Sequence, residues 1–250
     1  MKLLCSFLLV WLGILPVFAQ NPEVKSVGEL RKIMHDADLS AKIRLDTLNR
    51  ENLFAIGVVD SLRGEISIAH GKSLTSFIDN TFVRSDTTFN HSAAMLVYTY
   101  VKNWKIVTIE RDLDNLSDLS ELVKTLAADN GIDVTRPFPF MARTWVKNMS
   151  FHVINWQSGI THTADTHKQF AHELWHSAEV VLLTGFYSEN HQGIFTPYGS
   201  QLHVHAITAN PMTCGHLETL ETYGKISFYF PDSNEATKIV AVEAPKWEEF

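Results

Sequence analysis

The sequence predicts an α+β fold (α/β in its first half), and three observations lead to this class. Apolar residues recur at helical spacing in two segments, residues 26–39 and 117–131. Runs rich in β-branched and aromatic residues lie between these segments, and similar runs dominate after residue 138. We expect a mixed β-sheet with helices in an N-terminal lobe, residues 20–160, packed on a smaller, mostly antiparallel, barrel-like C-terminal lobe, residues 161–250.

The first twenty residues have the pattern of a secretory signal peptide, assigned to residues 1–19. Lys2 precedes an apolar run over residues 3–15, and Pro16 ends this run shortly before Ala19. The run is shorter than the about 20 residues that a membrane-spanning helix needs. We expect cleavage near Ala19, export to the periplasm or the cell exterior, and no membrane span in the mature chain.

The remaining elements follow from local signals. The first helix is expected to start at Ser26, with Glu29 three residues later completing a capping box. Two strands flank a turn at residues 60–64, and two β-rich runs lie within residues 92–110. The second helix is expected to begin at Ser117 or Asp118 and to end at the Asn-Gly pair of residues 130–131.

Composition limits the kinds of partner. The formal net charge is −7, and the sequence contains no run of lysines or arginines. Nucleic acid is therefore not an expected partner. Removal of Cys5 with the signal peptide leaves Cys214 without a partner for a disulfide within one chain. The fold is therefore expected to be stabilised by its core.

The stretch LHVHAITANPMTCGH, residues 202–216, predicts a metal site. Alternate residues of a strand point to the same face, so His203 and His205 lie side by side. The Asn-Pro pair that follows favours a turn, after which His216 begins a returning strand. Three histidines with a coordination position left open are typical of catalytic zinc. The alternative is three unrelated histidines on an exposed strand.

The segment HELWH, residues 172–176, competes for the same metal. It matches the H-E-x-x-H signature of zinc peptidases, in which a helix presents His172 and His176 while Glu173 acts as general base. The β-branched run that starts at residue 180 leaves little room for a long helix. No third ligand follows at the usual spacing, although Glu189 or Glu218 is a candidate. We favour a chance match.

The histidine spacing resembles that of the α-acetolactate decarboxylase family. In that family a "GF" strand and a glycine-containing loop precede His-x-His, and a third histidine follows eleven residues later. Here LLTGFYSENHQGI leads to His203 and His205, and His216 follows eleven residues after His205. The stretch FAIGVVDSLRGEISIAHGK resembles a pair of strands in the family and places Glu65 where the family keeps a catalytic glutamate. The resemblance covers roughly residues 26–221.

The resemblance implies an activity and its parts. It implies Zn²⁺ on His203, His205 and His216, and decarboxylation of (2S)-2-acetolactate, a 2-hydroxy-3-oxo acid, to (R)-acetoin through a metal-stabilised enediolate. Glu65 would transfer the protons. The resemblance also implies a homodimer. From the residues alone, a glutamate in an Arg-Gly-Glu turn is commonly a solvated hairpin residue, and only the resemblance makes Glu65 a catalytic candidate.

Two departures from the family pattern favour an alternative. Family members carry an arginine shortly after a "G.F" element, where this chain reads SFHVINWQ, so Arg143 or Lys147 would have to substitute. The family also brings a glutamate to the metal from its C-terminal tail, and Glu248 or Glu249 would have to take that part here. The alternative is a related metal-binding protein that is non-catalytic or acts on another substrate.

Overall fold

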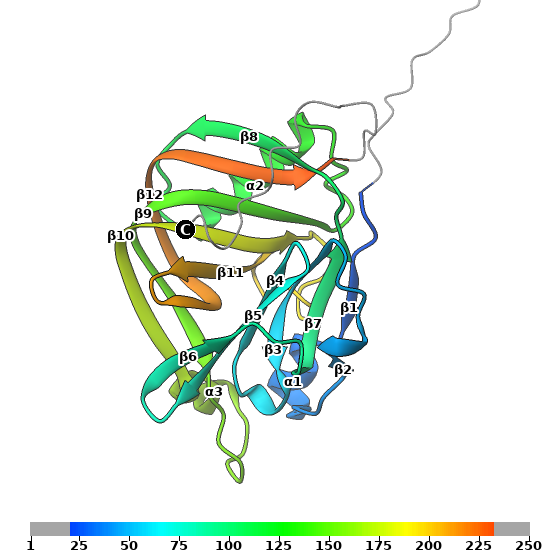
Figure 1. Cartoon of the computed structure of the whole chain (residues 1–250), viewed down its shortest axis with the longest axis vertical. Coiled ribbons are helices and arrows are strands. Elements are labelled where there is room, and N and C mark those ends of the chain that lie inside the picture. Colours follow the sequence, from blue (N-terminus) through cyan, green and yellow to red (C-terminus); the bar gives the residue numbers. More distant parts are fainter. Residues whose placement is uncertain (1–20, 233–250) are drawn as a thin grey trace, which may run out of the picture.

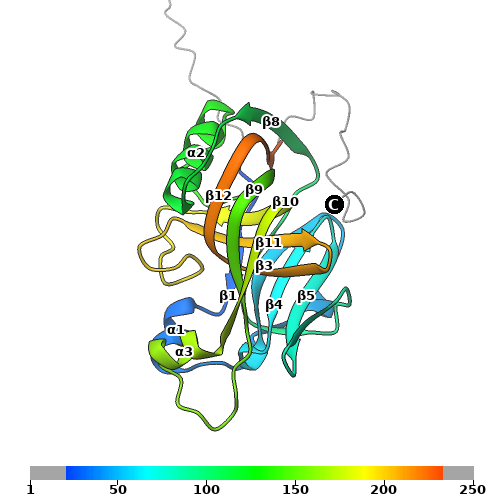
Figure 2. The same cartoon turned by 90° about the vertical axis from the view of Figure 1, so that its left-hand side faces the viewer.

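The α+β class is confirmed by two antiparallel β-sheets with three α-helices in residues 21–232, the part of the chain that the computed structural model describes (Figures 1 and 2). The predicted signal peptide and the tail that contains Glu248 and Glu249 lie outside these residues. Within residues 21–232, no helix combines the length and the hydropathy needed to cross a membrane.

The first sheet has seven strands in the order β1-β7-β3-β4-β5-β6, with β2 paired to β7. Each pairing in it is antiparallel, whereas the sequence led us to expect a mixed sheet. Parallel neighbours need crossovers of a dozen or more residues, and the links from β3 to β6 are short turns. The strands are β1 (Lys25–Val27), β2 (Ile43–Arg44), β3 (Leu53–Val59), β4 (Glu65–Ala69), β5 (Lys72–Asp79), β6 (Phe82–Asp86) and β7 (Ser92–Tyr100).

The second sheet has five strands in the order β11-β10-β9-β12-β8. Because β11 also pairs with β12, the strands β9 to β12 form a closed circuit of pairings, in keeping with the expected barrel-like arrangement. The sheet takes strands from both sides of residue 160. The strands are β8 (Trp104–Glu110), β9 (Phe138–Ile154), β10 (Ala171–Tyr187), β11 (Leu202–Ala209) and β12 (Met212–Pro231).

Strands β9, β10 and β12 are longer than the runs predicted from the sequence. The β-rich runs HLETLE, residues 216–221, and KISFYF, residues 225–230, are separate in the sequence pattern but belong to the single strand β12. Its pairing with β9 shifts register between Leu217 and Thr219 and twice more before Ile226. Such irregularities bend a strand without ending it, and Figure 2 shows β9 and β12 curving along the sheet.

The first helix, α1 (Leu30–Asp36), is shorter than predicted. Glu29 is its N-cap, and Ser26, predicted to be the cap, lies in β1 opposite Val97. Pairing with β7 therefore prevails over the capping signal. Between strand and helix, Gly28 has a φ of 70°, and an added Cβ would overlap the backbone carbonyl of Ala94. Glycine is needed at that position.

The other two helices differ in how well the sequence predicts them. Helix α2 (Leu116–Asp129) begins slightly earlier than predicted, because Asn115 caps it by accepting a hydrogen bond from the Asp118 backbone N–H. Helix α3 (Ala164–Phe170) was not predicted. It has a capping box in which Thr163 pairs with Thr166, and threonine replaces the glutamate or glutamine that marks such a box in sequence.

The two sheets pack on each other through a shared core. The rings of Phe54 on β3 and Phe186 on β10 lie 5.4 Å apart. Near the other end of the interface, Ser76 on β5 accepts a hydrogen bond from the backbone N–H of Cys214 on β12, at 2.8 Å. Strands β4 and β5 are thereby held against the hairpin of β11 and β12, which carries the predicted histidines.

Close packing around this hairpin predicts a large effect of one added methyl group. A Cβ at Gly215 would overlap the ring of Phe151 and the backbone carbonyl of His152. We expect Gly215→Ala to lower the free energy of unfolding by about 3 kcal/mol or more, because overpacking displaces backbone here. Urea denaturation measures the change.

A second glycine of β12 provides the control. Gly224 has a φ of 76° but nothing within 4 Å of an added Cβ. Gly224→Ala should cost about 1 kcal/mol, from backbone strain alone. Equal losses in the two variants would contradict the packing described for Gly215.

Candidate metal centre

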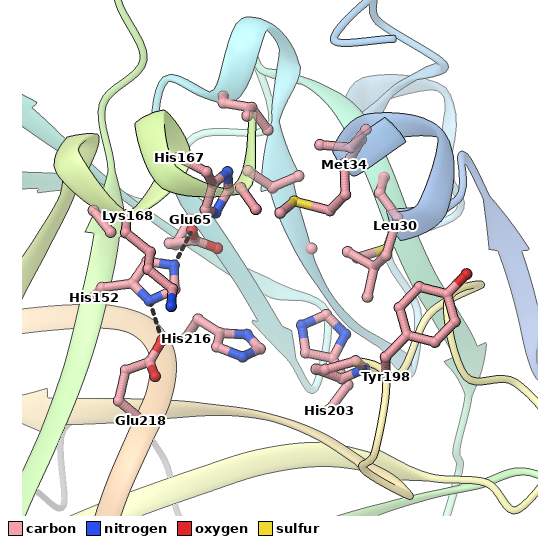
Figure 3. Close-up of a pocket in the computed structure, with 18 of the residues that line it drawn as sticks. Leu30, Met34, Glu65, His152, His167, Lys168, Tyr198, His203, His216 and Glu218 are labelled. Carbon is pink, nitrogen blue, oxygen red and sulfur yellow. Dashed lines mark hydrogen bonds and ion pairs between the residues drawn. The ribbon is translucent and has the colours of Figure 1, made fainter. Parts of the chain in front are cut away.

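A cavity of about 720 Å³ opens where the two sheets meet (Figure 3). The seven-stranded sheet contributes Glu65 and Val58 to its wall, and the five-stranded sheet contributes His152, His203 and His216. Helices α1 and α3 and the loop that carries Pro197 and Tyr198 also contribute to the wall. The cavity is within the size range of ligand sites.

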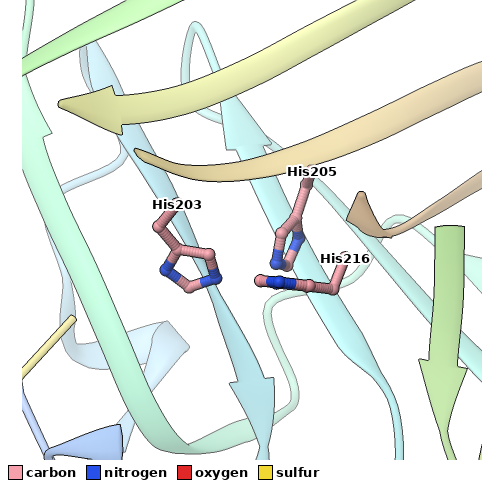
Figure 4. Close-up of side chains that lie close together, drawn as sticks. All are labelled: His203, His205 and His216. Atoms are coloured by element: carbon pink, nitrogen blue, oxygen red, sulfur yellow. The ribbon is translucent and has the colours of Figure 1, made fainter. Parts of the chain in front are cut away.

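The three predicted histidines converge beside this cavity (Figure 4). One nitrogen of each ring can be chosen so that all three lie within 4.8 Å of one another. His203 and His205 project from the same face of β11, as the period of a strand requires. His216 lies on β12 directly opposite His205 in the antiparallel register. The hairpin therefore brings the set together.

The ring nitrogens of this cluster fit a metal ion. His203 Nδ1 and His205 Nε2 are buried and have no hydrogen-bond partner. Leaving a buried polar atom unpaired is costly, and a coordinated cation would satisfy both nitrogens. The other nitrogen of His205, Nδ1, lies 3.2 Å from the hydroxyl of Ser67 on β4. A hydrogen bond to the non-coordinating nitrogen is the usual way in which a ligand imidazole is oriented.

The electrostatic environment keeps the three imidazoles neutral. Burial lowers the pKa of His203 to about 4. Burial, followed by the neighbouring histidines, holds the pKa values of His205 and His216 well below the usual range. Neutral imidazole is the form that binds a cation. The cluster is therefore ready for a metal at neutral pH without losing protons first.

Glu65 lies next to the cluster at the start of β4, and its side chain is buried. Its Oε2 is 3.6 Å from His205 Nε2, and its Oε1 is 3.7 Å from His152 Nε2. Burial raises the pKa of Glu65 to about 8, although the charge of His152 opposes this shift. Burial therefore favours the protonated form of this carboxyl in the metal-free protein, and Glu65 is not the solvated turn residue of the alternative interpretation.

His152 was not singled out from the sequence, yet it is central to the site. It lies on β9 opposite His216, and its Nδ1 is 2.6 Å from Glu218 Oε1. Burial works to lower the pKa of His152, but the hydrogen bond to Glu218 and the charges of Glu65 and Glu218 outweigh burial and raise it. His152 stands in the stretch SFHVINWQ, where the family pattern places an arginine after its "G.F" element.

The two residues suggested as substitutes for that arginine do not reach the cavity. Arg143 and Lys147 both lie on β9 with exposed side chains, and neither belongs to the cavity wall. Both residues precede an irregularity in the pairing of β9 with β12, and this irregularity separates them along the strand from His152. The cationic groups of the wall are His152 and Lys168.

The HELWH segment does not form a peptidase site. Residues 172–176 lie in strand β10, so the helix that the signature requires is absent from this part of the structure. His176 Nδ1 is 2.6 Å from Glu179 Oε1, and its ring stacks on Phe151. Glu173 lies opposite His152 and lines the cavity. Glu189, suggested as a third ligand, instead pairs with Lys124.

Fold and site together define an α+β protein with a buried three-histidine cluster at the junction of two antiparallel sheets. No protein-family model and no curated protein matches the sequence. The fold is that of α-acetolactate decarboxylases. The enzyme of Bacillus subtilis strain 168 superimposes with a TM-score of 0.70 at 13% identity, over 84% of this chain and 85% of that one.

Two further structures agree. The acetolactate decarboxylase of Bacillus subtilis subspecies spizizenii gives a TM-score of 0.69 at 12% identity, over 84% of this chain and 86% of that one. A Staphylococcus aureus protein of unknown function, described as similar to α-acetolactate decarboxylase, gives 0.66 at 15% identity, over 84% and 85%. The chain is thus similar in fold to these proteins while its sequence has diverged.

The cluster predicts which histidines bind a metal. His205→Ala should weaken Zn²⁺ binding by more than about 100-fold, since loss of an orienting group around a ligand alone costs 10–100-fold. His176→Ala is the matched control, because it removes a histidine of the HELWH segment and should leave affinity unchanged. Competition titration with a chelating dye measures both, and thermal denaturation confirms folding. Loss of affinity in His176→Ala alone would contradict the site.

The pKa of Glu65 predicts how the stability of the metal-free protein depends on pH. The carboxyl holds its proton to about pH 8 in the folded state and loses it near pH 4.5 when unfolded. The folded state therefore binds more protons between these values, and stability falls as pH rises through this window. In Glu65→Gln this component is absent. Between pH 5 and 8 the wild type should lose on the order of a few kcal/mol relative to the variant. Parallel urea-unfolding curves would contradict the raised pKa.

Proposed function

We propose that this chain is a metal-dependent decarboxylase of a 2-hydroxy-3-oxo acid, with conversion of (2S)-2-acetolactate to (R)-acetoin as the reference reaction. The observation that carries the proposal is the juxtaposition of three converging histidines with the buried carboxyl of Glu65, which lies 3.6 Å from His205. The fold shared with acetolactate decarboxylases supports it.

The metal of the proposal is Zn²⁺, held by His203, His205 and His216. A bound divalent cation supplies a Lewis acid that stabilises the negative oxygen created by loss of CO₂. His203 Nδ1 and His205 Nε2 are the buried nitrogens available to it. Ser67 keeps the ring of His205 in the orientation that presents Nε2 to the cluster.

Glu65 is the proposed proton donor. Loss of CO₂ leaves an electron pair on the carbon that carried the carboxylate, and that carbon must gain one proton to give acetoin. Burial raises the pKa of Glu65 toward neutral pH in the metal-free protein, and a general acid works best with a pKa near the working pH. His152 contacts Glu65 from the other side, at 3.7 Å, and keeps the carboxyl turned toward the cluster.

Positive charge for the substrate carboxylate is proposed to come from His152 and Lys168. Both line the cavity on the side that also contains Glu65 (Figure 3). A carboxylate placed between these groups would lie close to the histidine cluster. The ketone and hydroxyl oxygens of the same substrate would then face the histidine cluster.

An altered substrate or a non-catalytic role is the second candidate function. The observation that favours it is the cavity wall itself, which includes no arginine among the described residues. Export after cleavage near Ala19 and assembly as a homodimer remain proposals that follow from the N-terminal sequence and the family resemblance. N-terminal sequencing of the mature protein and its mass in solution test them.

The function predicts a specific dependence on metal and on Glu65. Purified protein should form acetoin from racemic acetolactate, lose this activity on chelation and regain it with Zn²⁺. Glu65→Gln should retain Zn²⁺ but lower turnover by about 10²–10⁴-fold, the usual contribution of a general acid.

Glu189→Gln is the matched control, because it removes the same charge at a surface carboxylate paired with Lys124. Its turnover should equal that of the wild type. Acetoin formation at the wild-type rate by Glu65→Gln would remove Glu65 from the mechanism. Absence of acetoin from the zinc-loaded wild type would favour the second candidate function.

A further inference from the structure

The cavity beside the histidine cluster has two chemically different halves (Figure 3). One half carries ionisable groups, and it contains Glu65, His152, His167, Lys168 and Glu218. The other half, here called the apolar wall, is formed by Leu30, Ile33, Met34, Val58, Leu62 and Met95. His203 and His216 lie between the two halves, so a molecule on the cluster would touch both.

The apolar wall is built as part of the fold. Ile33, Leu62 and Met95 are at most 2% exposed and belong to the core between the sheets. Leu30 and Met34 are half-buried and project from the same face of α1, four residues apart. The wall is therefore present before any ligand binds, and Leu30 and Met34 are its accessible part.

The position of α1 is fixed by the loop between β10 and β11. The backbone N–H groups of Leu30 and Arg31 donate to the carbonyls of Ile194 and Gly193, at 2.9 and 2.7 Å. The same loop carries Pro197 and Tyr198, which line the cavity next to the wall. A ligand that covers the wall need not order α1 first, and preorganisation of this kind favours affinity.

The wall offers no polar side-chain atom to a ligand. A hydroxyl or carboxylate placed against it would lose its hydrogen bonds to water without replacement, which is unfavourable. The alkyl substituents of acetolactate, one on each of its two central carbons, are both methyl groups. With its carboxylate on the charged half and its oxygens at the cluster, acetolactate would leave Leu30 and Met34 in contact with water.

We infer that the site is built for 2-hydroxy acids with a hydrocarbon arm longer than methyl, and that this arm lies on the apolar wall. The inference deepens the proposed function and rests on it for the orientation of the acid. Each methylene buried against the wall should tighten binding about fourfold. Met34 and Leu30 are the residues that determine specificity for the arm.

Binding can be tested without turnover. The probes are 2-hydroxy-2-methyl acids whose second alkyl chain grows from ethyl to hexyl. They lack the ketone and cannot lose CO₂. Calorimetry with the zinc-loaded protein should show a dissociation constant that falls about fourfold for each added methylene until the wall is covered. A constant affinity along the series would overturn the inference.

A pair of variants locates the arm. Met34→Gln keeps the length of the side chain and places an amide on the wall. It should weaken binding of the hexyl acid on the order of tenfold, with little change for the ethyl acid. Lys32→Gln is the matched control on the exposed face of α1 and should change neither. Equal effects of Met34→Gln on both acids, with an unchanged melting temperature, would contradict a role in recognising the arm.

Turnover separates this inference from the proposed function. The substrates are 2-hydroxy-3-oxo acids with the arm lengthened on either reacting carbon, and the readout is CO₂ release. A higher kcat/KM for long-arm acids than for acetolactate supports both. Release of CO₂ from acetolactate with no gain from either arm overturns the inference and leaves the proposed function standing. Tighter binding of long-arm acids without CO₂ release from any acid supports the arm site and rejects the decarboxylase.

Discussion

The site depends on the register of three neighbouring strands. Antiparallel pairing sets His205 on β11 opposite His216 on β12, and His216 opposite His152 on β9. A slip of one residue in any of these pairings would turn a histidine to the other face of the sheet. The hairpin sets the first pairing locally. The second pairing depends on the whole sheet, including the irregularities that bend β12 around the cavity.

Burial then determines the chemistry of the groups that the register assembles. The same lack of solvent that keeps three imidazoles neutral also raises the pKa of Glu65. Without a metal, this arrangement costs stability, because His203 Nδ1 and His205 Nε2 have no partner. A cation would reverse that cost. Burial therefore leaves the histidines in the neutral form that binds a cation.

Much of this site could be predicted from local sequence, and the rest could not, for physical reasons. The convergence of His203, His205 and His216 follows from the period of a strand and one turn. Glu65 became a candidate only through family resemblance, because a glutamate after Arg-Gly carries no local sign of burial. His152 was missed because its partner Glu218 is 66 residues away and depends on sheet register.

The fold shows the same division between local and long-range information. Strand runs and helix α2 follow from composition and capping signals. The strand conformation of Ser26 comes from pairing with Val97, which competes with the local signal for a helix. For the HELWH segment, the prediction that the peptidase signature is a chance match is supported, because pairing with β9 makes it a strand. Pairing between strands that are distant in the chain cannot be predicted from the local patterns of a single sequence.

X-ray absorption at the zinc edge of the zinc-loaded protein tests the central claim most directly. Coordination by His203, His205 and His216 requires three imidazole nitrogens at about 2.0–2.1 Å, with oxygen in the remaining positions. That spectrum in the wild type, reduced to two imidazoles in His216→Ala, is the predicted result. A zinc ion with fewer than three imidazole ligands in the wild type would contradict the account.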